Sequence, residues 1–339
     1  MKVLFIGGTG TISTACSRLC LERGMELWVV NRGTRNARLP RGTEYIRLDM
    51  DSPLAAVRNA LPGHTWDCVV DWTIFTPERL QRDIELFRGK TGQFIFISST
   101  GVYPGYDREH RIRETDPIDA GILPPYTSHK AECERIALEA FRGEGFPAVI
   151  VRPAHTYADF AIPTNIYGLG YGLVARINQG KEVIVHDDGL SLWGLTHSED
   201  FAAGLAGLIG LSRSIGEIFH ITTDEVLTWR EIFGTFEELL EKKARLLFIP
   251  SRAICGIDPE LGASLVGDRA KNRVFDNTKI KSFVNGFQAR ISFREGLKRA
   301  LAWHAANQDK IYPYAKADAS VDRIISVYKR DLKNAPPSK

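Results

Sequence analysis

Residues 2–13 read KVLFIGGTGTIS, a short apolar run followed by three glycines set among small polar residues. The apolar run has the length of a buried strand, and the segment from Thr14 to Arg23 has helical spacing of its apolar residues. Glycine at such a junction lets the chain turn sharply and lets the backbone approach a ligand closely. The stretch therefore predicts a strand, a tight turn and a helix whose N-terminus can hold phosphate groups.

The alternation of apolar runs with helix-length segments continues beyond this turn. Strands that alternate with helices indicate a parallel sheet covered on both faces, so we expect a doubly wound α/β fold. We assign residues 1–157 to the sheet domain, to which later segments return, 158–330 mainly to a smaller C-terminal substrate-binding lobe, and 333–339 to a frayed tail. The expected strands are 2–6, 27–30, 45–48, 68–70, 94–97 and 149–151, and the expected helices include 128–141, 229–242, 293–305 and 318–332.

Composition restricts the partners and the location. The 339 residues carry a formal net charge of +3 and are 44% hydrophobic, as is ordinary for a globular chain. Basic residues are interspersed with acids, which disfavours a nucleic-acid partner. No apolar run is long enough for a bilayer and residues 1–6 contain no leader pattern, so we expect a cytoplasmic protein without a membrane partner. The five cysteines form no CxxC pair, so we expect no metal site.

The glycine turn and the end of the second expected strand indicate a site for NAD or NADP. That strand lacks the terminal acidic residue that would bind an adenosine ribose. NADP is favoured over NAD because the guanidinium of Arg32 matches a ribose phosphate; a solvent-facing loop charge is the alternative. The residues expected in this part of the site are Gly7, Gly10, Thr11, Ile12, Asn31 and Arg32.

Two aspartates and a tryptophan follow later strands, at the sheet edge where open α/β sheets bind ligands. Asp49 is placed to accept from the adenine amine, and a helix N-cap is an equal alternative. Asp71 and Trp72 are expected to line the nicotinamide ribose, although a capping aspartate would show the same pattern.

A phenol and an ammonium lie four residues apart in Tyr126-Thr-Ser-His-Lys130, which puts them on one face of a helix. A nearby cation favours the phenolate and suits a tyrosine to proton transfer near neutral pH. Upstream, the apolar run from Phe94 to Ile97 ends in hydroxyl residues, and Ser99 among them can hydrogen-bond a reacting oxygen. This set predicts a catalytic site.

These motifs, in this order, resemble the extended short-chain dehydrogenase/reductase superfamily and its NAD-dependent epimerase/dehydratase group. The matching segments are the glycine turn at 7–13, the hydroxyl segment at 98–103, the Tyr126/Lys130 pair, and Arg152-Pro153 followed by Tyr157. The resemblance covers nearly the whole chain and implies a Rossmann-type sheet and an NAD(P)-dependent epimerase or oxidoreductase.

The resemblance also implies individual roles. Ser99 corresponds to the catalytic hydroxyl, with Thr100 as its fallback, and Tyr126 to the general acid/base. Lys130 corresponds to the residue that holds the nicotinamide ribose and lowers the pKa of the tyrosine, and Arg152 belongs to the cofactor site. Dehydratases of the family carry an Asp-Glu pair directly after the hydroxyl, where this chain has Thr100-Gly101, so dehydration is disfavoured.

The substrate lobe departs from nucleotide-sugar members of that family. Two arginines expected to bind a diphosphate align with Trp193 and Leu265, which leaves Arg269, Lys271 or Arg273 as substitutes. We therefore expect the substrate to be a smaller sugar, a glycoside or a modified nucleoside, and the reaction to take place at one of its hydroxyl or keto groups. The candidate substrate contacts are Thr100, His155, Trp193 and His197, and core packing is the alternative for the last three.

Two other functions remain possible for the same fold. Some plastid proteins that end the second strand in a similar Asn-Arg-Gly act on RNA, although the charge pattern and the Tyr126/Lys130 pair favour an enzyme. A protein that senses the dinucleotide without turning it over is the second. Family members commonly pair through the helix that carries the tyrosine, so apolar positions within 129–141 predict a homodimer.

Overall fold

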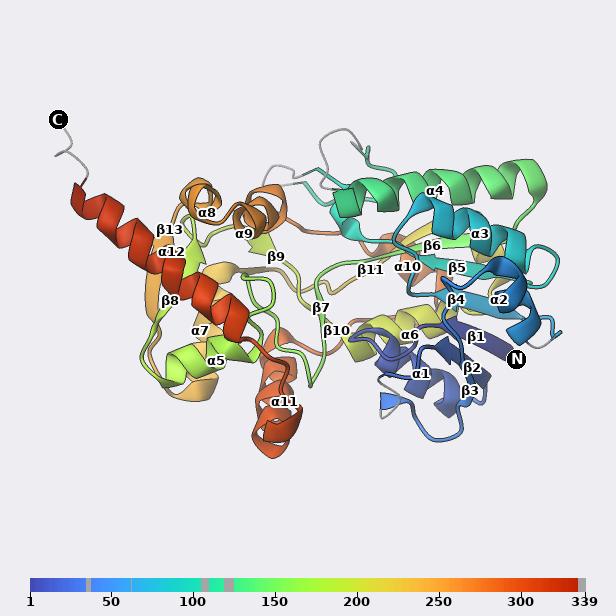
Figure 1. Ribbon diagram of the computed structural model, residues 1–339, viewed down its shortest axis with the longest axis horizontal. Helices are drawn as coiled ribbons and strands as arrows, with labels where there is room; N and C mark the ends of the chain where they lie inside the picture. Colours follow the sequence, from blue (N-terminus) through green and yellow to red (C-terminus); the bar gives the residue numbers. More distant parts are fainter. Residues whose placement is uncertain (35–37, 62, 105–109, 119–124, 335–339) are drawn as a thin grey trace.

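The computed structural model describes residues 1–34, 38–61, 63–104, 110–118 and 125–334. One half of the protein is built on a seven-stranded sheet in the order β3-β2-β1-β4-β5-β6-β11, and all six neighbouring pairs of strands are parallel (Figure 1). The strands are β1 (Lys2–Ile6), β2 (Glu26–Asn31), β3 (Glu44–Arg47), β4 (Cys68–Asp71), β5 (Phe94–Ile97), β6 (Ala148–Pro153) and β11 (Ile218–Ile221).

Two helical layers cover this sheet. On one face lie α1 (Ser13–Glu22), α6 (Ser198–Leu208) and α10 (Thr278–Phe283), which share an apolar cluster with alternate residues of the strands. On the other face lie α2 (Leu54–Ala60), α3 (Pro77–Phe87) and α4 (Pro125–Glu144), which form a second cluster (Figure 1). Burial on both faces explains why central strands such as β5, with the sequence FIFI, are apolar throughout.

The rest of the chain packs around a separate apolar cluster at the other end of the molecule (Figure 1). Its small sheet pairs β8 (Glu182–His186) with β13 (Arg245–Ile249) in parallel. Around it lie α5 (Tyr171–Asn178), α7 (Trp229–Leu240), α8 (Ser251–Ile257), α9 (Pro259–Ser264), α11 (Phe293–Ala306) and α12 (Ala315–Asn334). Short pairs of β7 (Thr156–Tyr157) with β10 (Thr196–His197), and of β9 (Leu192–Trp193) with β12 (Leu227–Thr228), lie between the two ends.

The expected doubly wound parallel sheet is confirmed, and six of its seven strands overlap the expected ones, whereas the edge strand β11 was not predicted. Segments after residue 157 also belong to the sheet half. The strand β11 forms one edge of the sheet, and α6 packs against α1 on one of its faces. The helix expected from 128 begins earlier, at Pro125, so Tyr126 lies in its first turn. Residues 335–339 of the expected tail lie outside the described residues. Within those residues, no helix has both the length and the apolar character that a bilayer span requires.

Candidate active site

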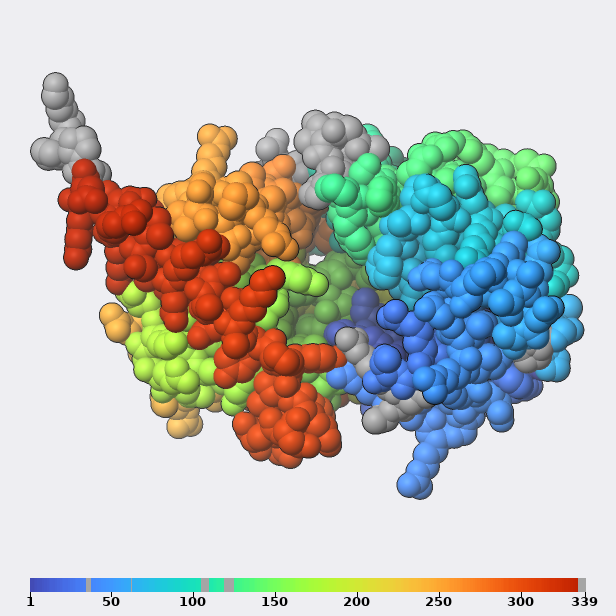
Figure 2. Space-filling view, viewed as in Figure 1, coloured from blue at the N-terminus to red at the C-terminus, as the bar shows by residue number. Residues whose placement is uncertain are grey.

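A cleft of about 870 Å³ lies between the sheet half and the C-terminal half. Figure 2 shows the surface hollowed where these two halves meet. One wall carries the glycine turn and the carboxyl ends of β4, β5 and β6, and the other carries residues of β9, α9 and the π-helical turn Leu265–Arg269. Its size is that of a small-molecule site, and its position is the edge where ligands of open parallel sheets bind.

The glycine turn fits a dinucleotide. Gly7 has φ +111°, and a Cβ there would lie 3.0 Å from the Cβ of Trp72, so a side chain is excluded on both counts. Gly10, Thr11 and Ile12 line the cleft directly. Ile12 gives the N-terminus of α1 no side-chain cap, and although the Thr14 amide donates to the Gly10 carbonyl at 3.2 Å, the positive end of the helix faces the cleft beside Ile12 and Ser13. The glycines leave room for the backbone to approach a pyrophosphate closely, and the positive end of the helix favours its negative charge.

The end of β2 separates the two residues predicted there. Asn31 is structural, since its amide donates to the Gly7 carbonyl at 3.4 Å and its Oδ1 accepts from the Gly33 amide at 2.6 Å. Arg32 is exposed and does not line the cleft. Arg38, which the sequence did not single out, donates to the Thr9 carbonyl at 3.5 Å and so faces the glycine turn.

The aspartates predicted for the cofactor are engaged elsewhere. Asp49 is exposed and accepts from the Asp51 amide at 3.1 Å, a local turn contact outside the cleft lining. Asp71 is fully buried and accepts from the amide and hydroxyl of Thr73 at 2.6 and 2.8 Å, with Arg79 3.4 Å away. The structure therefore favours the turn-capping alternative for both. Trp72 does line the cleft, and its indole nitrogen is buried with no hydrogen-bond partner in the described parts of the chain.

The three predicted catalytic side chains meet in the cleft. Ser99, Tyr126 and Lys130 all line it, although the first comes from the end of β5 and the others from α4. Tyr126 is 48% exposed, and its ring lies 6.2 Å from that of Phe75. Burial raises the pKa of the Tyr126 phenol, and the Ser99 hydroxyl opposes this rise by hydrogen bonding.

Lys130 is held more rigidly than Tyr126. The ammonium is 2% exposed and donates to the carbonyl oxygens of Ile74 and Ile97 at 2.6 and 2.7 Å. Burial lowers the pKa of Lys130 to about 8, and the nearby Cys133, Asp71 and Glu134 partly oppose that shift. The expected lowering of the Tyr126 pKa is not found, because desolvation of the phenol outweighs the hydrogen bond from Ser99.

Arg152 is buried near the carboxyl end of β6 and does not line the cleft. Its side chain is 1% exposed and forms a two-pronged ion pair with Glu134, with Nε–Oε1 at 2.9 Å and Nη2–Oε2 at 2.5 Å. Glu134 also accepts from the Ser98 hydroxyl at 2.5 Å, and Arg152 contacts the Tyr103 hydroxyl. The structure therefore does not bring Arg152 to the cofactor side; the pair ties α4 to β5 and β6 behind Ser99.

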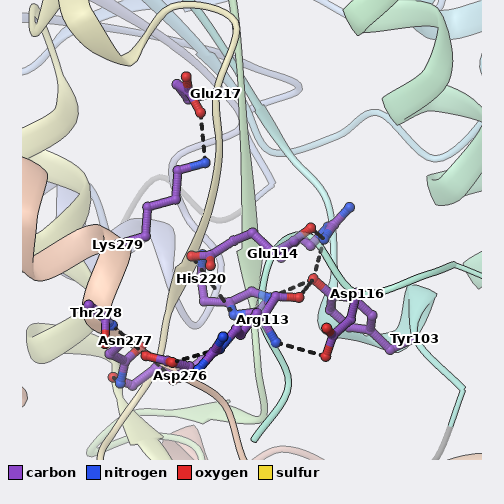
Figure 3. A network of polar contacts seen from close by, with 12 residues as sticks. Tyr103, Arg113, Glu114, Asp116, Glu217, His220, Asp276, Asn277, Thr278 and Lys279 are labelled. Atoms are coloured by element: carbon purple, nitrogen blue, oxygen red, sulfur yellow. Dashed lines mark hydrogen bonds and ion pairs between the residues drawn. The ribbon is translucent and has the colours of Figure 1, made fainter.

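A further polar network fixes the segment that follows the hydroxyl residues (Figure 3). The Tyr103 hydroxyl donates to the Arg113 carbonyl at 3.0 Å and contacts Nε2 of His220 at 2.7 Å. Glu114 accepts from the His220 amide at 2.9 Å, and Arg113 donates to Asp276 at 3.2 Å. Burial lowers the pKa of His220 to about 3, so its ring is neutral. The network anchors residues 110–118 to β11 and to the start of α10.

The predicted substrate contacts divide into two groups. Thr100, His155 and Trp193 line the cleft, whereas His197 does not. His197 is 1% exposed, contacts Asp159 at 3.0 Å and caps α6 by accepting from the Glu199 amide at 3.3 Å, which is the packing role left open above. Its placement favours this packing role over a substrate contact.

The tautomer of His155 follows from its hydrogen bond. The indole of Trp193 donates to Nδ1 of His155 at 3.1 Å, and burial lowers the pKa of this imidazole to about 3. With Nδ1 accepting and the ring neutral, the proton resides on Nε2. His155 is therefore a fixed hydrogen-bond donor on the cleft wall.

Besides Arg38, which lies beside the glycine turn, sequence reasoning missed three residues that line the cleft. Phe75 and Tyr167 line the cleft and are 51% and 79% exposed, and Glu260 contributes a carboxylate from the first turn of α9. Exposed aromatics on a cleft wall are unusual for packing and indicate a ligand surface. No local pattern distinguished them, because Phe75 follows β4 whereas Tyr167 and Glu260 belong to the C-terminal half, and they share one cleft only in the folded protein.

Comparison with known proteins agrees with this arrangement. Residues 3–221 match the model of the NAD dependent epimerase/dehydratase family. The chain belongs to that family. The membership expected from the four ordered motifs is thus confirmed, as is the Rossmann-type fold. The family match extends from β1 through β11 and so includes the glycine turn, Ser99 and the Tyr126/Lys130 pair.

Three relatives illustrate the range of the family. The 2'-dehydrokanamycin reductase of Streptomyces kanamyceticus is 24% identical over 74% of this chain and 70% of its own length. The chloroplast stem-loop binding protein of 41 kDa b of Arabidopsis thaliana is 24% identical over 89% of this chain and 74% of its own length. The structure of the dTDP-glucose 4,6-dehydratase DesIV of Streptomyces venezuelae, which contains NAD, superposes with a TM-score of 0.73 at 20% identity and covers 93% of this chain and all of that one.

Proposed function

We propose that this protein is a nicotinamide-dependent oxidoreductase or epimerase acting on a hydroxyl or keto group of a sugar or sugar derivative. The observation that carries the proposal is that Tyr126, Ser99 and Lys130 meet in one cleft with the glycine turn. Residues 1–157 with the returning segments would hold the cofactor, and residues 158–330 would supply most of the substrate side.

Tyr126 would handle the proton. The raised pKa of its phenol keeps it protonated at neutral pH, which suits it to donate a proton to the oxygen of a ketone. The Ser99 hydroxyl would hydrogen-bond that oxygen and hold it beside the phenol. When bound, the nicotinamide supplies or accepts the hydride, so the side chains need only orient the substrate and move this proton.

Lys130 would hold the cofactor ribose. An ammonium has three donors, and two of them are used by the carbonyls of Ile74 and Ile97. The third has no acceptor among the residues that the structure describes, and Lys130 lines the cleft, so a ribose hydroxyl is a suitable partner. The two carbonyls fix the direction of this donor, which is why Lys130 acts by position rather than by mobility.

The side chains of the cleft favour oxidation, reduction or epimerisation over dehydration. Dehydration needs an acid and a base beside the reacting carbons, and Thr100-Gly101 provides neither at that place. The name of the 2'-dehydrokanamycin reductase describes reduction of a keto sugar derivative, which supports the same class for this chain. His155, as a fixed donor, would bind an oxygen of the sugar.

Arg38 makes NADP the preferred cofactor in this proposal. Its guanidinium faces the glycine turn, and its position on the rings of Phe160 and Tyr312, with centroids 4.5 and 5.0 Å away, holds it there. An arginine held in this way suits a ribose phosphate better than the exposed Arg32 does.

The proposal is tested with Tyr126→Phe. Turnover of a keto-sugar panel with NADPH should fall by about 10²- to 10⁴-fold, because the proton donor is lost, while the dissociation constant for NADPH stays within about twofold. Tyr167→Phe, the same change at an exposed cleft tyrosine, is the matched control and should retain the proton-transfer step. Unchanged turnover in Tyr126→Phe removes this residue from the mechanism.

RNA binding is the second candidate, since the name of the Arabidopsis relative describes stem-loop binding. Electrophoretic shift of an RNA stem-loop, with no calorimetric response to any of the four nicotinamide dinucleotides, would move it to first place. Dinucleotide binding without turnover would instead indicate a sensing protein.

A homodimer that pairs through α4 is a separate proposal, and the apolar residues on which it was based are used inside the fold. The apolar positions of α4 that motivated it, Cys133, Ile136 and Ala137, pack against the sheet. The outer face carries Arg135 in ion pairs with Glu132 and Glu139. Light scattering on the purified chain decides the matter.

A further inference from the structure

Arg269 is a half-buried cation whose guanidinium has no ion-pair partner among the described residues. It ends the π-helical turn after α9 and lines the cleft. Its Nε is shielded from solvent without a hydrogen-bond partner, and its guanidinium forms no ion pair within the described part of the chain. A shielded N–H group without an acceptor is costly, so folding alone does not account for the position of this side chain.

The backbone at Arg269 is held firmly. Its carbonyl oxygen accepts from the Ser191 hydroxyl at 2.8 Å and lies 3.0 Å from Nε2 of His186. The other ring nitrogen of His186 lies 3.3 Å from the Asn165 amide nitrogen. This chain of contacts ties the π-helical turn to β8, so that the guanidinium is presented to the cleft without a need for rearrangement.

The other basic residues nearby are already engaged or face elsewhere. Arg273 is 3% exposed, lies 3.0 Å from Asp268 and donates to the Tyr103 carbonyl at 2.9 Å. Lys271 is exposed and lies outside the cleft lining. Of the three basic side chains that the sequence left as alternatives, only Arg269 combines a place in the lining with a free guanidinium among the described residues.

The charges around Arg269 limit what it can bind. Glu260, on the same wall of the cleft, is an exposed carboxylate that forms no ion pair within the described ranges. It would repel a ligand that carries several negative charges along this wall. Burial lowers the pKa of Arg269, and the carboxylate of Asp268 and the phenol of Tyr167 partly oppose this shift. Tyr167 lines the same cleft as Tyr126 and Arg269, so the cation lies on the wall that faces the proposed reaction centre.

We propose that Arg269 is an anion-binding residue and that the substrate carries a single acidic group, a phosphate monoester or a carboxylate, on the sugar that reaches Tyr126. This inference rests on the proposed function, because it assumes that the sugar occupies the same cleft. A guanidinium binds either group through two parallel hydrogen bonds, so the shared chemistry is a planar pair of anionic oxygens.

The test measures binding of three sugars to the full chain loaded with NADPH. The probes are α-D-glucose 1-phosphate, D-glucuronate and the neutral D-glucose, titrated by calorimetry or by saturation-transfer NMR. Wild type should bind at least one charged sugar about 10- to 100-fold more tightly than glucose, and Arg269→Gln should abolish that preference. Lys271→Gln, the same charge loss two residues away, should keep it.

The relative affinity of the phosphate and the carboxylate identifies the acidic group. Equal binding of charged sugars by wild type and Arg269→Gln, loss of the preference in Lys271→Gln, or no preference for charge in wild type overturns the inference. Arg269→Met replaces the glutamine variant if that one does not fold. Failure of wild type to bind NADH or NADPH refutes the proposed function instead, so the two failures are told apart in the same samples.

Discussion

Replacement of the buried Lys130 by methionine should change how the stability of the protein depends on pH. Burial lowers the pKa of this ammonium from 10.5 to about 8. Because one pKa unit corresponds to about 1.4 kcal/mol, charging Lys130 costs about 3 kcal/mol more in the folded protein than in the unfolded chain. The residue is 2% exposed, so solvent screening reduces this figure little.

The direction of the effect follows from the two pKa values. Below pH 8 both states hold the proton, and the folded state bears the whole cost. Between pH 8 and 10.5 the unfolded chain still holds the proton and the folded protein has released it, so the free energy of unfolding rises with pH. Lys130→Met has no such proton, and its curve lacks this rise.

Urea unfolding at intervals from pH 7 to 10.5 measures the effect. The free energy of unfolding of wild type minus that of Lys130→Met should increase by about 3 kcal/mol over this range. Taking the difference cancels other groups that titrate there. Lys90→Met, which removes an exposed ammonium, is the matched control and should follow wild type. Parallel curves for wild type and Lys130→Met would refute the reasoning, because they would mean that burial does not alter the proton affinity of Lys130.

Substitutions of Glu134 and Arg38, with Arg32→Ala as a comparison for the second, test other contacts of the site. Glu134→Gln should lower the free energy of unfolding by about 3 kcal/mol in urea titrations, because it leaves the buried Arg152 without its carboxylate; a loss below about 1 kcal/mol would show that the pair contributes little. Arg38→Ala should weaken NADPH about tenfold and NADH by less than about twofold in calorimetry, whereas Arg32→Ala should change neither, since Arg32 is exposed and, unlike Arg38, has no contact with the glycine turn among the described residues. Equal losses of NADPH and NADH in Arg38→Ala would remove the ribose phosphate from the assignment.

The proposed catalytic set could be picked out of the sequence because local geometry brings its members together. The four-residue spacing of Tyr126 and Lys130 forces both onto one helical face, and Ser99 follows a strand whose end must lie at the ligand edge of a parallel sheet. The glycine turn is also local, since positive φ at Gly7 requires glycine whatever surrounds it. Such features need no knowledge of distant contacts.

Residues whose partners are distant in sequence were harder to assign. Arg152 was placed at the cofactor, but its partner is Glu134 on a helix that precedes it, and no spacing rule links the two. His197 was placed at the substrate, but it caps α6 and contacts Asp159. A sequence motif shows which part of the fold a side chain lies in. Which residue pairs with that side chain depends on how distant helices and strands pack together.

The sequence by itself determined the parallel sheet, the glycine turn and the positions of Ser99, Tyr126 and Lys130, because strand alternation, glycine conformation and helical spacing act over short stretches of chain. Only the tertiary structure decided which charges remain free: Arg38 faces the glycine turn, Arg273 is paired with Asp268, and Arg269 is left without a partner in the described cleft. Burial and pairing, which set the electrostatics of a site, depend on residues brought together from distant parts of the chain.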